Sequence, residues 1–264
     1  GYREHSDGHQ ARLSANTGYR ISANAETRFY LNVNSIRQRL PGEVTKDVAL
    51  NSPRSAAPEF VQLDQQRNID SVRIANKTTL RFGDTTVDFG LFGVHRHVMH
   101  PIYQWLDYRV NDYGGFARAT DDRQIGGFRN RLIAGVNLHN GSIDNKQYIN
   151  VDGSKGNLAA SNVDDSKNVS FYVENSFYVR PDISLIVGAA LQHASRERRD
   201  RFTSDGNQSG RRTYDHFSPK VGVLWDIDAT WQAFANKKRT AMLNHRAMEP
   251  LYGRQCRSHG APGH

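Results

Sequence analysis

The sequence has a single cysteine, Cys256, and no apolar run approaching the length of a transmembrane helix. One cysteine excludes an internal disulfide framework and a zinc site made of several cysteines. Because no stretch of about 18 apolar residues occurs, the chain is not a helical membrane protein. The same argument does not exclude a membrane β-barrel, because only alternate residues of its strands are apolar.

Catalytic signatures are also missing from the chain. It has no Gly-x-Ser-x-Gly turn, no phosphate-binding Walker loop and no His-Glu-x-x-His metal motif. The net charge of +8 makes nucleic acid a partner to consider, but lysine and arginine are spread along the whole length rather than gathered in one basic stripe. We therefore predict that the protein is not an enzyme, needs no cofactor or metal, and does not bind nucleic acid.

What the sequence does contain is a period of two, clearest in residues 12–34. After a turn at 22–25 the alternation repeats over 27–34. Since successive side chains of a strand point to opposite faces, this stretch predicts a hairpin with one apolar and one polar face. The apolar face of its first strand carries Leu13, Ala15, Thr17, Tyr19 and Ile21.

Further strands and their connections indicate the fold class. Irregular stretches at 40–67, 98–107, 141–167 and 195–213 alternate with short turns, so an up-and-down sheet would carry all long loops at one end. Outer-membrane barrels have this arrangement. We predict an all-β fold, an antiparallel up-and-down transmembrane β-barrel present in part, with about ten strands of a larger barrel. The remaining strands are expected at 71–82, 87–91, 108–120, 131–139, 169–178, 183–192, 217–225 and 231–236.

Two alternatives fit parts of this pattern. A soluble extracellular β-rich binding module would bury each apolar sheet face against another one, and it gives no reason for sorting long and short connections to opposite ends. A passive porin-like channel would share the barrel but not energised uptake. On the barrel interpretation the apolar face meets lipid, the polar face meets the lumen, and the turn at 22–25 is periplasmic.

Four segments resemble the TonB-dependent outer-membrane receptors: 171–177 (FYVENSF), 181–185 (PDISL), 217–225 (FSPKVGVLW) and 231–236 (WQAFAN). The resemblance extends over roughly residues 1–236. It implies part of a barrel of about 22 strands with a plugged lumen. It also implies uptake of ferric siderophores or other iron chelates across the outer membrane of a Gram-negative bacterium, with the TonB complex acting through a plug domain.

The chain departs from that family pattern at several points. No plug domain, TonB box or signal peptide is recognisable, and Lys237-Lys238-Arg239-Thr240 replaces the family's Arg-Ser-Phe-Pro continuation. We therefore expect a partial barrel over residues 1–236 that is inactive as a transporter by itself. Residues 237–264 are expected to form an irregular basic tail that is disordered or frame-shifted. Outer-membrane lipid and lipopolysaccharide are expected contacts of the barrel.

Three histidines, His95, His97 and His100, form the first candidate binding site. On an extended strand His95 and His97 share one face and lie about 7 Å apart. They could hold a metal or an iron chelate near the extracellular rim. Without an acidic or cysteine partner close in sequence, a solvated strand end explains the same residues.

Arginines crowd the fourth irregular stretch and form the second candidate site. Because ferric siderophores are often anionic, these side chains could capture cargo, or they could contact the phosphates of lipopolysaccharide. A solvated loop partly balanced by Glu197, Asp200 and Asp205 is the alternative. The candidates are Arg196, Arg198, Arg199, Arg211 and Arg212.

Overall fold

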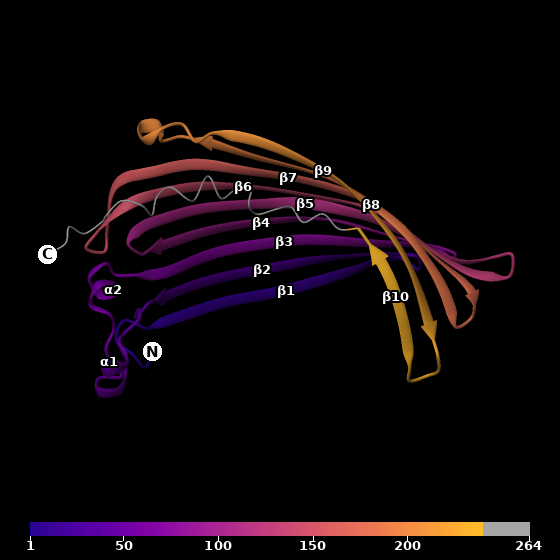
Figure 1. Ribbon diagram of the computed structural model, residues 1–264, viewed down its shortest axis with the longest axis horizontal. Coiled ribbons are helices and arrows are strands. Elements are labelled where there is room, and N and C mark those ends of the chain that lie inside the picture. The colour runs from indigo at the N-terminus through magenta and orange to yellow at the C-terminus, as the bar shows by residue number, and fades with distance from the viewer. Residues whose placement is uncertain (240–264) are drawn as a thin grey trace.

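The structure, a computed structural model that describes residues 1–239, is dominated by one curved antiparallel sheet (Figure 1). Ten strands follow one another in chain order, each hydrogen-bonded to the next, so β1 and β10 are its two edges. The predicted up-and-down all-β fold is confirmed as an unclosed part of a barrel wall. The strands are β1 (Gly8–Ser22), β2 (Ala25–Arg39), β3 (Gln66–Phe82), β4 (Thr85–Pro101), β5 (Gln104–Ile125), β6 (Phe128–Val151), β7 (Ser154–Arg180), β8 (Ile183–Asp200), β9 (Gly210–Asp226) and β10 (Gln232–Lys238).

An apolar band runs across one face of the sheet. In β1, β7, β8 and β9 it spans nine residues each, 13–21, 169–177, 183–191 and 217–225. At a strand rise of about 3.3 Å per residue this is about 26 Å along the strand. A transmembrane β-strand, which is tilted by about 45°, needs about 9–11 residues to cross the hydrocarbon core. The band therefore has the length along the strand that a tilted membrane strand requires.

The hydrophobic side chains of the sheet point outward rather than into a core. Phe171 is 55% exposed and Leu191 is 56% exposed, although they face each other across β7 and β8. Among residues 1–239 the buried hydrophobic side chains are small ones, Ala56, Ala57, Val163 and Ala194. A soluble sandwich would bury the large apolar residues instead, so the sheet is built for an apolar surrounding medium.

The polar face is the more crowded of the two. In β9, Phe217 and Val221 are exposed, whereas Ser218 is buried and Lys220 is half-buried. Side chains converge on the concave side of a curved sheet and spread apart on the convex side. The polar face is accordingly the inner, concave face, and the apolar face is the outer one.

The connections sort to the two ends of the sheet, which we call the loop end and the turn end. Figure 1 shows α1 and α2 at the loop end, and the β9–β10 turn at the opposite end. The turn end carries the connections at residues 23–24, 83–84, 126–127, 181–182 and 227–231. The loop end carries those at residues 40–65, 102–103, 152–153 and 201–209.

Two of the predicted irregular stretches are wrong. Residues 98–107 contain a two-residue turn between β4 and β5, and residues 141–167 form most of the long β6–β7 hairpin, which turns at 152–153. Beyond the apolar band both faces of a strand meet polar surroundings, so the alternation ends while the backbone ladder continues. The stretch 195–213 also shortens, because only 201–209 connect β8 to β9, with the 3-10 turn η1 (Thr203–Asp205).

The connection between β2 and β3 contains two short helices that the alternation did not predict. α1 (Lys46–Asn51) begins after Thr45, whose Oγ1 accepts a hydrogen bond from the Val48 N–H at 3.3 Å. α2 (Pro58–Gln62) begins at a proline, which suits a first helical turn because its missing N–H would be unpaired there. No helix within residues 1–239 is long and apolar enough to cross a membrane.

The predicted division into a barrel over 1–236 and a tail over 237–264 stays a prediction. β10 continues to Lys238, two residues beyond the predicted end of the barrel. The rest of the predicted tail, from residue 240, lies outside the described residues.

Candidate functional site

The arginines predicted to capture cargo lie at the loop end of β8 and β9, where strand geometry divides them between two faces. Their side-chain alternation continues unbroken from the apolar band, so residue parity assigns each to a face. Arg199 and Arg211 lie on the outer face. Arg196, Arg198 and Arg212 lie on the inner, polar face.

Arg196 and Arg212 form a pair of guanidinium groups on the inner face. They are direct cross-strand partners between β8 and β9. The half-buried Arg196 donates from Nη2 to Asn168 Oδ1 and from Nη1 to the Ser195 carbonyl oxygen, each at 2.8 Å, while Arg212 is exposed. Within residues 1–239 no carboxylate forms an ion pair with either one. Two adjacent cations without an acid between them favour an anion.

The other two arginines of β8 are neutralised by aspartates of β7. Arg198 donates from Nε and Nη2 to the two carboxylate oxygens of Asp164, at 2.6 and 2.7 Å. Arg199 lies 2.6 Å from Asp165 on the outer face. Sequence reasoning missed both aspartates because it assigned 141–167 to a loop. Continuing the alternation back from Val169 would have placed Asp164 and Asp165 on opposite faces.

The three predicted histidines do not converge on one point. His95 and His97 share the outer face, as predicted, and His95 Nδ1 lies 2.7 Å from Asn111 Oδ1. His97 Nε2 lies 2.8 Å from Asp107, while His100 is on the opposite face with its Nδ1 2.7 Å from the Gln66 carbonyl oxygen. Within the described residues no group of three or more His, Cys, Asp or Glu side chains is arranged to hold a metal ion. Their role in binding stays a prediction.

Asp107 is the most constrained carboxylate of this histidine region. Burial acts to raise the pKa of Asp107, but hydrogen bonds from Lys155 and His97 outweigh it, so the pKa lies below its usual value. Lys155 Nζ lies 3.0 Å from the Asp107 carboxylate and 3.9 Å from the centre of the Tyr148 ring. The Asp107 hydrogen bond outweighs the effect of burial and raises the pKa of Lys155. Asp107 and Lys155 are therefore a charged pair at neutral pH.

The geometry defines the class of protein first: an outer-membrane-type barrel wall with an apolar outer band and a cationic pair on its inner face at the loop end. Residues 1–237 match the family described as TonB dependent receptor-like, beta-barrel. The chain belongs to this family, which consists of receptors and transporters. No curated protein sequence matches the chain.

Solved structures with a similar fold include a ferric citrate transporter and a siderophore receptor. The ferric citrate transporter FecA, in its unliganded form, superposes with a TM-score of 0.76 at 13% identity, covering 89% of this chain and 36% of that one. The alcaligin outer membrane receptor FauA from Bordetella pertussis gives 0.65 at 13% identity, covering 87% and 35%. The siderophore receptor PiuA from Acinetobacter baumannii gives 0.69 at 9% identity, covering 86% and 41%.

At such low identities the likeness shows the fold alone. The chain spans about a third of the length of FecA and of FauA. A barrel wall of ten strands thus corresponds to one part of a larger receptor.

Proposed function

We propose that this barrel wall belongs to an outer-membrane receptor of a Gram-negative bacterium that imports an anionic ferric siderophore or other iron chelate. Energy would come from the TonB complex acting through a plug domain. Membership of the receptor family and the iron-chelate titles of the neighbouring structures support this assignment. The ten strands alone would not transport cargo, because β1 and β10 leave unpaired edges that lipid cannot hydrogen-bond.

The observation that carries the proposal is the Arg196–Arg212 pair. It lies on the inner face at the loop end, and within residues 1–239 it has no neutralising carboxylate. Charge-assisted hydrogen bonds from guanidinium to oxygen anions are among the strongest in proteins, and their fork geometry suits carboxylate groups. An iron chelate with negatively charged oxygen ligands offers that chemistry. Outer-face Arg199 and Arg211 would instead meet lipid or lipopolysaccharide.

The test is iron uptake by cells that carry the full-length receptor. Uptake of radiolabelled iron is measured with three probes: ferric citrate, a ferric catecholate and a ferric hydroxamate. We expect the double variant Arg196→Ala/Arg212→Ala to raise the half-saturation concentration for the anionic chelate about ten- to a hundred-fold, through loss of charge-assisted hydrogen bonds.

Arg211→Ala is the matched control, because Arg211 is the neighbour of Arg212 in sequence but lies on the outer face. It should leave uptake unchanged. The proposal is wrong if both variants behave alike, or if the unaltered receptor imports none of the three chelates.

A further inference from the structure

Residues 1–7 and 40–65 fold together at the loop end, and we call them the strap. The strap contains α1 and α2, which have six and five residues and bury none of them. Its fully buried apolar side chains are the small ones of Ala56 and Ala57, while Phe60 and Leu63 are half-buried. Short helices without a buried face are marginal on their own. Polar contacts therefore contribute strongly to holding the strap in place.

Arg3 joins the two halves of the strap. Its Nε donates to the Ser55 carbonyl oxygen at 2.9 Å, and its Nη1 and Nη2 donate to the Gly42 and Pro41 carbonyl oxygens at 2.8 and 3.2 Å. Gly42 has a φ of +69°, and a Cβ there would lie 2.4 Å from the Phe60 ring. The planar guanidinium therefore binds a loop whose backbone at position 42 requires glycine.

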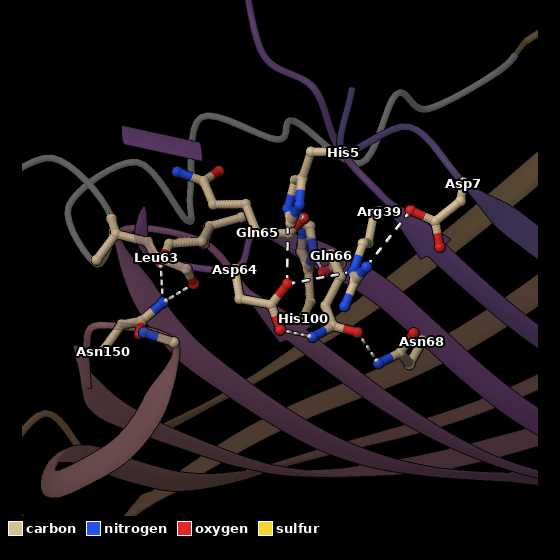
Figure 2. A network of polar contacts seen from close by, with 12 residues as sticks. His5, Asp7, Arg39, Leu63, Asp64, Gln65, Gln66, Asn68, His100 and Asn150 are labelled. Carbon is tan, nitrogen blue, oxygen red and sulfur yellow. Dashed lines mark hydrogen bonds and ion pairs between the residues drawn. The ribbon is translucent and has the colours of Figure 1, made fainter. Parts of the chain in front are cut away.

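Asn150, at the end of β6, ties the strap to two hairpins. Figure 2 shows its side chain meeting the backbone at Leu63. The side-chain nitrogen donates to the Leu63 carbonyl oxygen at 2.9 Å and to the Ile102 carbonyl oxygen at 2.7 Å. The side-chain oxygen accepts from the Gly153 N–H at 3.0 Å. One buried amide therefore links the strap, the β4–β5 turn and the β6–β7 turn.

Asp64 is the second anchor (Figure 2). Its carboxylate lies 3.3 Å from Arg39 Nε and 3.7 Å from His5 Nε2, and it accepts a hydrogen bond from Gln66 Nε2 at 2.8 Å. Arg39 also lies 3.5 Å from Asp7. These contacts fix the strap to the ends of β2 and β3.

Backbone strain is concentrated at the same anchors. Within residues 1–239, the non-glycine residues with positive φ are His5 at 51°, Asp64 at 42° and Asp152 at 46°. His5 faces Asp64, and Asp152 Oδ1 accepts a hydrogen bond from Gln62 Nε2 of the strap at 2.9 Å. Strained conformations persist only where surrounding contacts enforce them, and they cluster at parts that switch. His5 and Asp64 would relax if the strap came away, whereas Asp152 keeps its positive φ in the two-residue β6–β7 turn with Gly153.

We propose that the strap is a latch that holds the β4–β5 and β6–β7 turns together and opens as one unit. Opening exchanges polar bonds for bonds to water, so the net free-energy cost of each bond is small, and it relieves the strained backbone of His5 and Asp64. The β4–β5 and β6–β7 pairings are made between the strands themselves and not through the strap. The latch would therefore open while the sheet stays intact, freeing the two turns at the loop end. This inference does not depend on the proposed cargo.

Hydrogen exchange of the full-length receptor in detergent tests the latch. Asn150→Asp keeps the shape of the side chain but turns its donor nitrogen into an acceptor facing two carbonyl oxygens. We expect amides of residues 40–65 and of the turn at 102–103 to exchange about ten-fold faster, by one common factor, because a shared buried hydrogen bond is lost. Amides of the apolar band in β6 and β7 should be unchanged.

Asn137→Asp is the control, since the side chain of this asparagine of β6 makes, within residues 1–239, a 3.4 Å contact with Ser170 Oγ and none with the strap. It should leave the amide exchange rates of the strap and of the two turns unchanged. Acceleration confined to residues 150–153, or none, would overturn the latch. If Asn150→Asp prevents assembly of the receptor, Arg3→Lys is tested instead. Lysine lacks the planar guanidinium that donates to three carbonyl oxygens of the strap. If the amide exchange rates of the strap and of the turn at 102–103 changed by different factors in that variant, the proposal of a single opening unit would also be wrong.

Discussion

Between residues 169 and 177, β7 alternates apolar and polar side chains, and its large hydrophobic groups lie exposed on the outer face. Between residues 154 and 168 the same strand carries lysine, aspartate and asparagine on both faces, with ion pairs such as Arg198–Asp164 and Arg199–Asp165. Pairing to β8 begins at Asn162 and continues without a register shift through Phe177, across the boundary between the two regions. The surroundings change along the strand, while the backbone structure does not.

This difference assigns separate roles to the two regions. In the apolar band the side chains face lipid, which cannot form hydrogen bonds. Each outward position therefore requires an apolar side chain but no specific partner residue. At the loop end many polar side chains have a specific partner, such as Arg198 with Asp164, whereas Arg196 and Arg212 have no acidic partner among the described residues. On the proposed function, recognition would belong to the loop end, and the band would hold it in the membrane.

A charge placed on the outer face in the middle of the band should have the largest effect on the free energy of unfolding. Val173 is the central residue of the nine-residue apolar stretch of β7. We expect Val173→Arg to lower the free energy of unfolding of the full-length receptor in lipid vesicles by about 2–4 kcal/mol, the cost of an arginine facing lipid at the midplane. Urea titration followed by tryptophan fluorescence measures it.

Ser170→Arg provides the matched control on the polar face of the same strand. It should change the free energy of unfolding by much less, because the new side chain reaches the aqueous lumen. Equal losses for the two substitutions would mean that the faces do not differ in their solvent.

A smaller effect should follow from Asp107 at the loop end. The pKa of Asp107 is lowered in the fold, because hydrogen bonds from Lys155 and His97 outweigh burial. Its contribution to stability is thus present above the usual carboxyl pKa and is lost as the pH falls through the lowered value. Asp107→Asn should destabilise the β4–β5 hairpin by about 1 kcal/mol at pH 7. The difference from the unaltered protein should shrink below about pH 4.

Hydrogen exchange of residues 104–110 at pH 7 and at acid pH measures this difference. Asp84→Asn, in the exposed β3–β4 turn, is the control and should leave those amides unchanged at every pH. A destabilisation by Asp107→Asn that persists undiminished in acid would show that the charge of Asp107 does not hold the hairpin.

The sequence predicted the membrane part of this fold better than the loop end, for a physical reason. The hairpin of 12–34 turns at 23–24, within the predicted 22–25, because lipid on one side and water on the other impose strict alternation. Above the band both faces are polar, so the extensions of β6 and β7 looked like loops. The helices α1 and α2 could have been found from the capping residue Thr45 and from Pro58.

The candidate site was only partly predictable. The arginines were found from their crowding, but their division into inner and outer sets depends on β8 continuing as a strand to Asp200. The anchors of the strap could not be found from the sequence. Asn150 lies far along the chain from Leu63 and Ile102, and only the fold brings them together.

The central claim is that the apolar face meets lipid and the polar face meets water. Nitroxide labels at Phe171→Cys and Ser170→Cys, in a Cys256→Ser background, test it on adjacent residues of opposite faces. In the full-length receptor in lipid vesicles, relaxation by apolar oxygen and by a water-soluble nickel complex is compared. The label at position 171 should respond mainly to oxygen and the label at position 170 mainly to nickel. Equal accessibility of the two labels, or the reverse order, would contradict the account.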